Sequence, residues 1–377
     1  MGLLEPRLRR RGARRAGVHR PRRAGRGRAR RPAAAARRRT RDDPAAGAHR
    51  AHRHRGGRRR VRVRRVRLQR ARPRLAVARR HRLRADASPA RHHGRCPVTS
   101  PPPPPALDLD TLRDALEAAV HDACEAIRTV MRRGSVRVGH KWGEGPVTEA
   151  DHAADEILHR RLTPLITGAH WLSEESEQEH PLVPGEPTWV IDPLDGTREF
   201  LRGLPEFGVS VGLFAEDRLV LGAAGLPAGE EPVVYSGLVT DGRSEARVDG
   251  VWLPTLDGSG VDADGEGDPG RIVVSRWDYE HRRLQHRLPF DVYPLGSAVV
   301  KLVHAATGEA GVYLSTGPRS VWDAAGGAAV LAAAGGVILQ TNGQPLHLSP
   351  QQERIPPFVA GAPARATALL RSLGVEV

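Results

Sequence analysis

Two acidic residues three positions apart, Asp192 and Asp195, are the first candidates for chemistry in this sequence. They lie in the stretch TWVIDPLDGTREF (188–200), directly after an apolar run, with Pro193 between them. Asp-Gly next to apolar residues is also a common hairpin signal, so a turn with solvated acids is the competing interpretation. Carboxylates at the end of a buried strand can instead point into a cleft and bind a hard cation such as Mg²⁺.

Further acidic residues occur where other elements are expected to begin or end. Glu174 and Glu175 follow a short apolar step, and Asp323 opens an expected helix. Mg²⁺ takes oxygen ligands and commonly touches substrate phosphate as well, so acids from separate elements and a backbone carbonyl near Pro193 match its preference. Each acid also has an ordinary explanation, because Asp323 fits a helix N-cap and the two glutamates fit a solvated surface.

Helical and strand-like segments alternate in the part of the chain that carries these acids. Apolar residues recur at helical spacing over 110–132, and Thr148-Glu-Ala-Asp151 resembles a capping box that opens a second helix. Loops are expected over 134–147 and 250–270. The other expected elements are strands at 189–191, 208–214, 219–224, 233–235, 271–275 and 311–314 and helices at 298–306 and 324–334. This mixture favours a layered α/β or α+β architecture.

Charge is distributed very unevenly along the 377 residues. Residues 1–100 contain 36 Arg, no Lys and four acidic residues, whereas the other 277 residues carry 23 basic and 39 acidic ones. The net charge of +16 therefore describes two different segments. The first segment has few large apolar residues, so we expect residues 1–105 to be a disordered Arg/Pro-rich segment.

Two interpretations of this Arg-rich segment compete. Its residues are largely those with GC-rich codons, which is typical of upstream DNA translated from a mis-assigned start. The alternative is a genuine arm that binds nucleic acid or directs targeting. We expect no signal peptide, because no apolar stretch follows the basic start. Cys96 and Cys124 are the only cysteines, and no apolar run is long enough to cross a membrane, which fits a cytoplasmic protein.

Four motifs resemble those of a known family. They are VTEAD (147–151), SEES (173–176), WVIDPLDGTREF (189–200) and VWDAAGGAAVLAAAGG (321–336). Their order and spacing resemble the Mg²⁺-dependent, lithium-sensitive inositol monophosphatase superfamily over 107–377. The residues after DPLDGT, Arg198-Glu199-Phe200, are most similar to its 3′(2′),5′-bisphosphate nucleotidase branch. The resemblance implies a sugar-phosphatase-like αβαβα sandwich, which we expect to divide into an α+β metal-binding domain (106–225) and an α/β domain (226–377).

The resemblance also implies a set of metal ligands. Glu174, Asp192 and the carbonyl of Leu194 are implied to hold one Mg²⁺. Asp192, Asp195 and Asp323 are implied to hold a second, so that Asp192 bridges the pair. The resemblance leaves a third ion open. Glu175 matches a family acid near that third ion, and Lys141 matches a basic residue on the loop before VTEAD.

Further roles follow from the same resemblance. Thr197 is implied to orient the attacking water, with Asp151 accepting the proton of its hydroxyl. Gly196 and Thr197 are implied to receive phosphate at the start of a helix. Ser297 and Lys301 are implied to line the substrate pocket, and a solvent-facing helix lysine is the alternative for Lys301.

Two positions depart from the family pattern. Trp277-Asp278 stands where many bisphosphate nucleotidases carry a histidine, which weakens the nucleotide assignment. Thr316 stands where inositol phosphatases place a substrate-binding glutamate, which argues against inositol.

The implied function is a Mg²⁺-dependent phosphatase that removes the 3′-phosphate of adenosine 3′,5′-bisphosphate by metal-activated water. AMP and phosphate are the products, which links the protein to sulfate assimilation. Inositol monophosphatase or fructose-1,6-bisphosphatase activity is the enzymatic alternative. An Arg-rich nucleic-acid-binding protein with an inactive phosphatase-like domain is the alternative of another class. Relatives are often dimers, so a homodimer is left open.

Overall fold

The computed structural model describes residues 59–62, 108–141, 145–175, 181–261 and 267–377, and Arg58–Val377 form one compact unit. The helices are α1 (Leu109–Arg132), α2 (Glu149–Leu162), α3 (Thr197–Arg202), α4 (Arg276–Glu280), α5 (Ala298–Thr307), α6 (Val321–Ala333) and α7 (Pro363–Ser372). Short 3-10 turns lie at Thr163–Leu165 and Leu284–His286. Within the described part of the chain, no helix is long and apolar enough to cross a membrane.

A seven-stranded sheet carries the first half of the fold. In sheet order its strands are β10 (Val251–Trp252), β9 (Arg243–Val248), β8 (Val233–Thr240), β7 (Arg218–Leu226), β6 (Gly208–Ala215), β5 (Thr188–Asp195) and β4 (His170–Ser173). Neighbouring strands are antiparallel except for β4 and β5, which are parallel. The domain boundary expected between residues 225 and 226 falls inside this sheet, because β7 pairs with β8.

A five-stranded sheet forms the second half. In sheet order its strands are β12 (Val292–Leu295), β11 (Ile272–Ser275), β13 (Val312–Ser315), β17 (Phe358–Gly361) and β15 (Val337–Gln340). The first three run parallel to one another, and β17 is antiparallel to both of its neighbours. A small pair, β14 (Arg319–Ser320) with β16 (Arg354–Ile355), lies just before α6.

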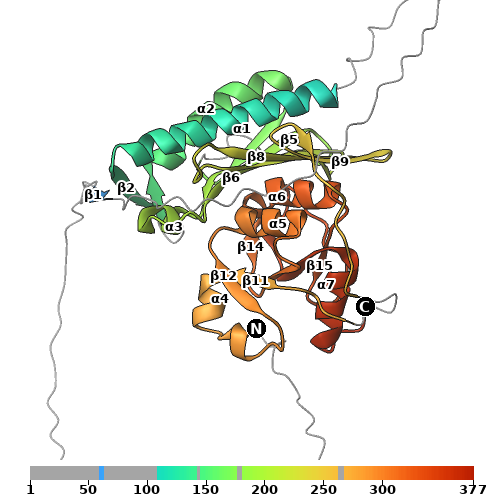
Figure 1. The fold of residues 1–377 in the computed structure, drawn as a ribbon. Coiled ribbons are helices and arrows are strands. Elements are labelled where there is room, and N and C mark those ends of the chain that lie inside the picture. The colour runs from blue at the N-terminus through green and yellow to red at the C-terminus, as the bar shows by residue number, and fades with distance from the viewer. Residues whose placement is uncertain (1–58, 63–107, 142–144, 176–180, 262–266) are drawn as a thin grey trace, which may run out of the picture. The chain divides into compact units, whose positions relative to one another are not determined.

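Helices and sheets alternate in layers, as Figure 1 shows. Helices α1 and α2 pack on one face of the seven-stranded sheet, α5 and α6 lie between the two sheets, and α7 packs on the five-stranded sheet. Separate apolar clusters fill the spaces between these layers, among them Leu116 and Ile127 of α1 on one side and Leu302 and Val330 of the middle helices on the other. The expected layered αβαβα sandwich is confirmed.

Two segments expected to be loops contain strands, and one of them, 250–270, contains β10. The glycine-rich stretch 134–147 contains β2 (Ser135–Lys141), which pairs antiparallel with β3 (Gly145–Thr148). Valines alternate with other residues in this stretch, and that period of two is typical of a strand despite the glycines. Four residues of the segment expected to be disordered, Arg59–Arg62, pair with β2 as strand β1. The rest of 1–105 lies outside the described residues.

Candidate active site

A bulge in β5 explains how two acids three residues apart face the same side. Residues three apart in a regular strand point to opposite faces. Here Asp192 pairs with Ser210 and Asp195 with Gly208, so β5 has one more residue than β6 between the two pairs. Pro193 lies within the bulge and has no N–H to donate to the sheet, so it is tolerated there. The bulge thus restores a common direction for the two carboxylates.

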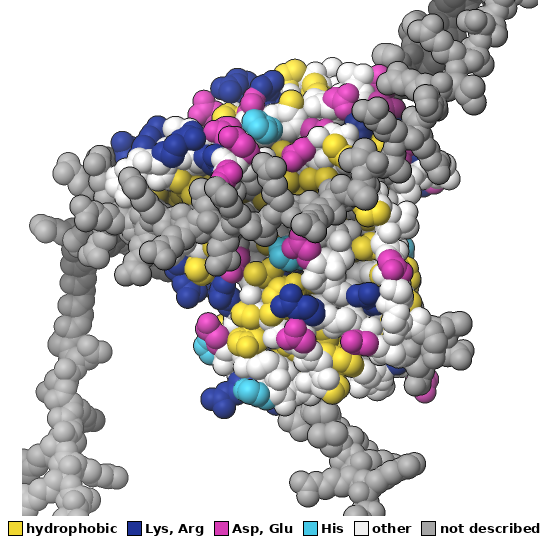
Figure 2. Space-filling view, in the orientation of Figure 1, with side chains coloured by type: hydrophobic (Ala, Val, Ile, Leu, Met, Phe, Trp, Pro, Cys, Tyr) yellow, Lys and Arg dark blue, Asp and Glu magenta, His cyan; other side chains and the backbone are white. Residues whose placement is uncertain are grey.

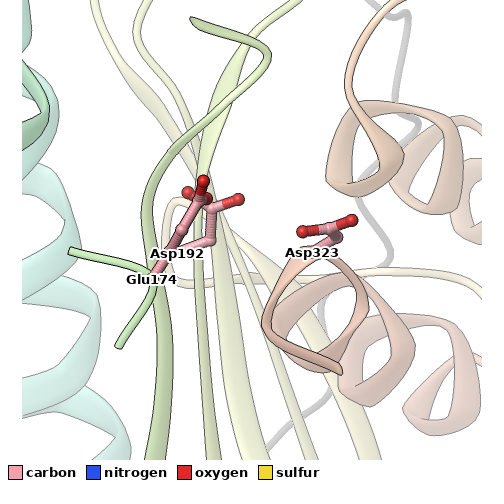
Figure 3. Close-up of side chains that lie close together, drawn as sticks. All are labelled: Glu174, Asp192 and Asp323. Carbon is pink, nitrogen blue, oxygen red and sulfur yellow. The ribbon is translucent and has the colours of Figure 1, made fainter. Parts of the chain in front are cut away.

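Three carboxylates from separate elements meet at this edge of the sheet. Glu174 follows β4, Asp192 belongs to β5, and Asp323 lies in the first turn of α6. One oxygen from each lies within 4.8 Å of the others, and Figure 3 shows Glu174 and Asp192 side by side with Asp323 facing them. The structure therefore brings together three of the four acids expected to bind metal.

Asp195, the fourth acid, lies next to this cluster and is fixed by α5. Its Oδ2 accepts hydrogen bonds from the hydroxyl of Ser297 and from the backbone N–H of Val299, each at 2.7 Å. Because the negative charge lies at the N-terminal end of α5, the helix dipole stabilises it. Among the described residues no hydrogen bond is made to Oδ1, which leaves that oxygen for a ligand.

Other carboxylates of the site are held in the same way, through one oxygen. Oδ1 of Asp192 accepts the N–H of Leu194 at 2.9 Å. Oδ2 of Asp323 accepts the N–H of Ser320 at 3.2 Å in a capping box. The N-cap expectation for Asp323 was wrong, because Ser320 is the N-cap residue of α6 and Asp323 completes the capping box from position N3 with one oxygen. Its other oxygen remains available to the cluster.

Burial and mutual repulsion raise the pKa values of two acids of the cluster. Burial raises the pKa of Asp192 well above its usual value, and Glu174, Asp195 and Asp323 raise it further. Burial, and then Asp195, raises the pKa of Asp323 to about 7. A divalent cation removes this repulsion and is coordinated by carboxylate oxygens, so the residues present fit Mg²⁺.

Thr197 and Asp151 form a second part of the site. The Thr197 hydroxyl lies 3.1 Å from Oδ1 of Asp151 and 3.1 Å from the carbonyl oxygen of Leu194, and it can donate to either. Oδ2 of Asp151 accepts the N–H of Thr148 at 2.8 Å in the expected capping box, which is confirmed. Burial raises the pKa of Asp151 to about 7. Asp151 therefore caps α2 and contacts Thr197 at the same time.

A cavity of about 650 Å³ opens over these residues. The expected metal ligands, Gly196, Thr197, Ser297 and Lys301 all line it. Its lining also includes the basic residues Arg198, Arg276, Arg282, Arg319 and Arg354. The arginines were not expected from the sequence. The stretch GPRSVWD (317–323) places Arg319 four residues before Asp323, and this proximity was a signal that could have identified it.

Lys301 is buried, so the solvent-facing alternative was wrong. The residue is 2 % exposed, and its ammonium group donates to the carbonyl oxygens of Leu295, Gly296 and Ser297. Burial lowers its pKa to about 7. Lys301 therefore stabilises the turn that carries Ser297.

The two positions that depart from the family pattern contact each other. Asp278 is buried, accepts the hydroxyl of Thr316, and also binds the hydroxyl of Ser275 at 2.7 Å and Arg282 at 3.3 Å. The exposed ring of Trp277 lines the cavity beside them. The side chains of Glu175 and Thr316 lie in the described part, whereas that of Lys141 lies outside it.

The family model of the inositol monophosphatase family matches residues 108–372. The chain belongs to the inositol monophosphatase family. The match includes every acid of the site described above. It begins one residue before α1 and ends with α7, so the Arg-rich segment is outside it.

Curated relatives of this family member carry different names. An inositol-1-monophosphatase of Mesorhizobium japonicum is 30% identical over 213 residues, which cover 54% of this chain and 76% of the relative. A 3′(2′),5′-bisphosphate nucleotidase CysQ of Aggregatibacter actinomycetemcomitans is 37% identical over 126 residues, or 33% of this chain and 46% of the relative. A histidinol-phosphatase of Chlorobaculum parvum is 38% identical over 96 residues, or 26% of this chain. The match spans only 36% of that last relative.

Solved structures show the same fold. The extragenic suppressor protein suhB from Bartonella henselae matches with a TM-score of 0.56 at 21% sequence identity. That match covers 71% of this chain and 100% of the Bartonella protein. This match shows the fold, whereas the family model and the relatives support a phosphatase of the inositol monophosphatase family without choosing among substrates.

Proposed function

We propose that this chain is a Mg²⁺-dependent phosphatase that hydrolyses the 3′-phosphate of adenosine 3′,5′-bisphosphate to AMP. The observation that carries this proposal is the convergence of Glu174, Asp192 and Asp323 within 4.8 Å in the wall of a large cavity. The proposed substrate links the protein to sulfate assimilation in the cytoplasm.

The acids of the cluster are proposed to hold two ions. Glu174, Asp192 and the carbonyl of Leu194 would hold one, and Asp192, Asp195 and Asp323 the other. Bound Mg²⁺ would supply positive charge beside the phosphate and lower the pKa of a water molecule. The single-oxygen anchoring of these side chains supports the assignment, because it leaves a second carboxylate oxygen of each aspartate for a ligand.

Thr197 and Asp151 are proposed to position the attacking water. The threonine hydroxyl has one hydrogen, and when it donates that hydrogen to Asp151 its lone pairs accept a hydrogen bond from water. Asp151 must be ionised to accept strongly, and its buried position makes this dependent on pH. Positioning of this kind reduces the entropy lost on reaching the transition state.

The rest of the cavity supports a substrate with a second anionic group more than one whose remaining part is a neutral polyol. Arginines line it, and the carboxylate of Asp278 is already bound by Ser275, Thr316 and Arg282. Asp278 is thus an acidic acceptor that could bind the hydroxyl groups of inositol, but its carboxylate is already bound by other side chains. Inositol monophosphatase activity remains the second candidate, because the inositol-1-monophosphatase relative covers more of this chain than the nucleotidase relative does.

A substrate panel tests the proposal. Purified protein would be assayed with adenosine 3′,5′-bisphosphate, inositol 1-phosphate, fructose 1,6-bisphosphate and histidinol phosphate, with Mg²⁺ titrated and Li⁺ added. We expect the highest kcat/KM for the nucleotide and no turnover without Mg²⁺. A large preference for inositol phosphate would contradict the nucleotidase assignment and favour the second candidate.

The non-enzymatic alternative makes a different prediction. A nucleic-acid-binding protein with an inert phosphatase-like domain would bind DNA with a steep salt dependence that disappears when residues 1–97 are deleted. It would release no phosphate. On the face shown in Figure 2, basic side chains of the described residues lie close to acidic ones.

A further inference from the structure

The arginines of the cavity differ in whether a carboxylate neutralises them. Arg276 forms an ion pair with Glu206, and Arg282 forms one with Asp278. Arg319 lines the same cavity and is half-buried, yet no described carboxylate lies within ion-pair distance of it. Charged groups removed from water are costly unless a counter-charge is present. The position of Arg319 therefore calls for an anion from outside the protein.

The orientation of Arg319 is fixed by hydrogen bonds within the protein. Its Nε donates to Oγ of Ser315 at 3.2 Å, and that hydroxyl donates to the carbonyl oxygen of Gly317 at 3.1 Å. Ser315 is fully buried, so this support is rigid. Tyr313 and, less strongly, Asp323 and Asp195 raise the pKa of Arg319, so the guanidinium stays charged and lies close to the acid cluster.

Lys301 does not compete for this role. Its ammonium group already donates to three carbonyl oxygens and lies 5.1 Å from the ring centroid of Tyr313. An ammonium group has three hydrogens, so no donor is left for a ligand in this arrangement. Arg319 is thus the half-buried cation of the described cavity that is oriented but lacks an ion pair.

We propose that Arg319 binds a second anionic group of the substrate while the phosphate to be hydrolysed lies at the acid cluster. Arginine suits this task, because its planar guanidinium can donate two parallel hydrogen bonds to a phosphate. The inference rests on the proposed phosphatase function and specifies its substrate class as a bisphosphate. Arg319 is then a specificity-determining residue, and Ser315 is a positioning residue behind it.

Paired substrates test this inference. Arg319→Gln removes the charge and keeps a polar but shorter side chain. We expect kcat/KM for adenosine 3′,5′-bisphosphate to fall about tenfold to a hundredfold, because a hydrogen bond to a charged group is lost. The kcat/KM for adenosine 3′-monophosphate should change by less than about twofold, since that substrate lacks the second anion. An equal loss on both substrates would overturn the inference.

Two further variants test whether the contact made by Arg319, and not the net charge of the protein, sets the preference for the bisphosphate. Ser315→Ala should lower the preference for the bisphosphate in the same direction but less, because the guanidinium loses its support. Arg287→Gln removes an exposed arginine outside the cavity lining and should leave the preference unchanged. A preference altered as much by Arg287→Gln as by Arg319→Gln would mean that net charge, and not this contact, sets it.

A binding measurement gives a readout independent of turnover. AMP carries only the second anion, so its dissociation constant can be measured calorimetrically without Mg²⁺. We expect Arg319→Gln to weaken AMP binding about tenfold and to leave binding of uncharged adenosine unchanged. Equal AMP affinity in both proteins would contradict the inference.

Failure of the inference and failure of the proposed function can be told apart. The substrate preference of the wild-type protein tests the function, whereas the change in preference caused by Arg319→Gln tests the inference. If the wild-type protein prefers inositol phosphates, the same comparison is made with inositol 1,4-bisphosphate and inositol 1-phosphate. A selective loss on the bisphosphate would then support the inference although the nucleotidase assignment had failed.

Discussion

Ser297 donates its hydroxyl to Oδ2 of Asp195 at 2.7 Å, although the two residues are 102 positions apart in the sequence. The contact joins the end of β5 to the start of α5 and thereby fixes one proposed metal ligand from the opposite layer. Ser297 has a positive φ of 49°, so the backbone is bent to make this contact. The acid cluster therefore depends on the packing of the two sheets as well as on its own residues.

Replacing Ser297 with alanine should weaken metal binding without abolishing it. The N–H of Val299 still holds Oδ2 of Asp195, so only one of two anchoring hydrogen bonds is lost. Residues that support a ligand typically change metal affinity by about 10- to 100-fold. We expect the Mg²⁺ concentration for half-maximal activity to rise about tenfold. An unchanged Mg²⁺ titration in Ser297→Ala would contradict this role.

Asp195→Asn should reduce turnover at least about a hundredfold while the protein stays folded, because the charge facing the cluster is lost. The asparagine oxygen can still accept hydrogen bonds from Ser297 and Val299, so the fold keeps this contact. Activity and circular dichroism would be measured together. Asp241→Asn, at an exposed ion pair with Arg218, is the control and should retain its activity. A near-normal rate in Asp195→Asn would rule out the metal assignment.

The couple of Thr197 and Asp151 predicts a specific dependence on pH. Burial raises the pKa of Asp151 to about 7, so the group loses its charge as pH falls below that value. We expect kcat to fall on the acid side with a midpoint at or below about pH 7, since bound cations favour the ionised form. Thr197→Ala should lower kcat about a hundredfold, and Thr197→Ser should recover much of the loss. If kcat of an Asp151→Asn variant still falls on the acid side with the same midpoint, a group other than Asp151 is responsible for this pH dependence.

The same acids predict how pH changes the stability of the metal-free protein. The pKa of Asp323 is about 7 in the fold against an ordinary value of 3.8, so the folded chain binds more protons between those values. The free energy of unfolding contributed by this group is therefore largest at low pH and falls as pH rises from about 4 to 7. Mg²⁺ should raise Tm more at pH 8 than at pH 5. Scanning fluorimetry with Mg²⁺ or EDTA measures this difference, and a shift that does not vary with pH would contradict it.

Gly196→Ala tests the turn between β5 and α3. Gly196 has a φ of 95°, and an added Cβ would lie 2.8 Å from the carbonyl oxygen of Glu206. The backbone must shift, so we expect a loss of about 1–3 kcal/mol in stability together with displacement of Thr197. Gly242→Ala is the control, because an added Cβ there meets nothing within 4 Å. Equal melting curves for Gly196→Ala and the wild type would show that the turn tolerates a side chain.

Apolar periodicity predicted the layers well, because burial on one helix face imposes a period that is visible in the sequence. The residues of 110–132 at helical spacing form the buried face of α1, and the capping box at Thr148 begins α2 as expected. The strands β6 and β7 lie close to their predicted ranges. Glycines misled the interpretation of 134–147, since pairing of β2 with β3 outweighs their weak strand propensity.

The acids of the site were predictable because they lie at the ends of elements, whereas its arginines were not. The importance of each arginine depends on its partners far away in the sequence. Arg276 pairs with Glu206, whereas Arg319 makes no ion pair among the described residues. Burial of Lys301 was missed for a similar reason. Apart from His304, its neighbours in 298–306 are apolar, which fits the place of α5 between two sheets.

The bulge in β5 allows two residues to stand between acids that share a face. One residue removed between Asp192 and Asp195 would leave a regular strand in which the two acids, then two apart, still face the same side, but Pro193 or Leu194 would be lost with it. Substitutions can vary the pocket walls around it without changing this step. The proposed metal chemistry therefore depends on one irregular step along one strand, and new specificities must arise in the surrounding loops and helices.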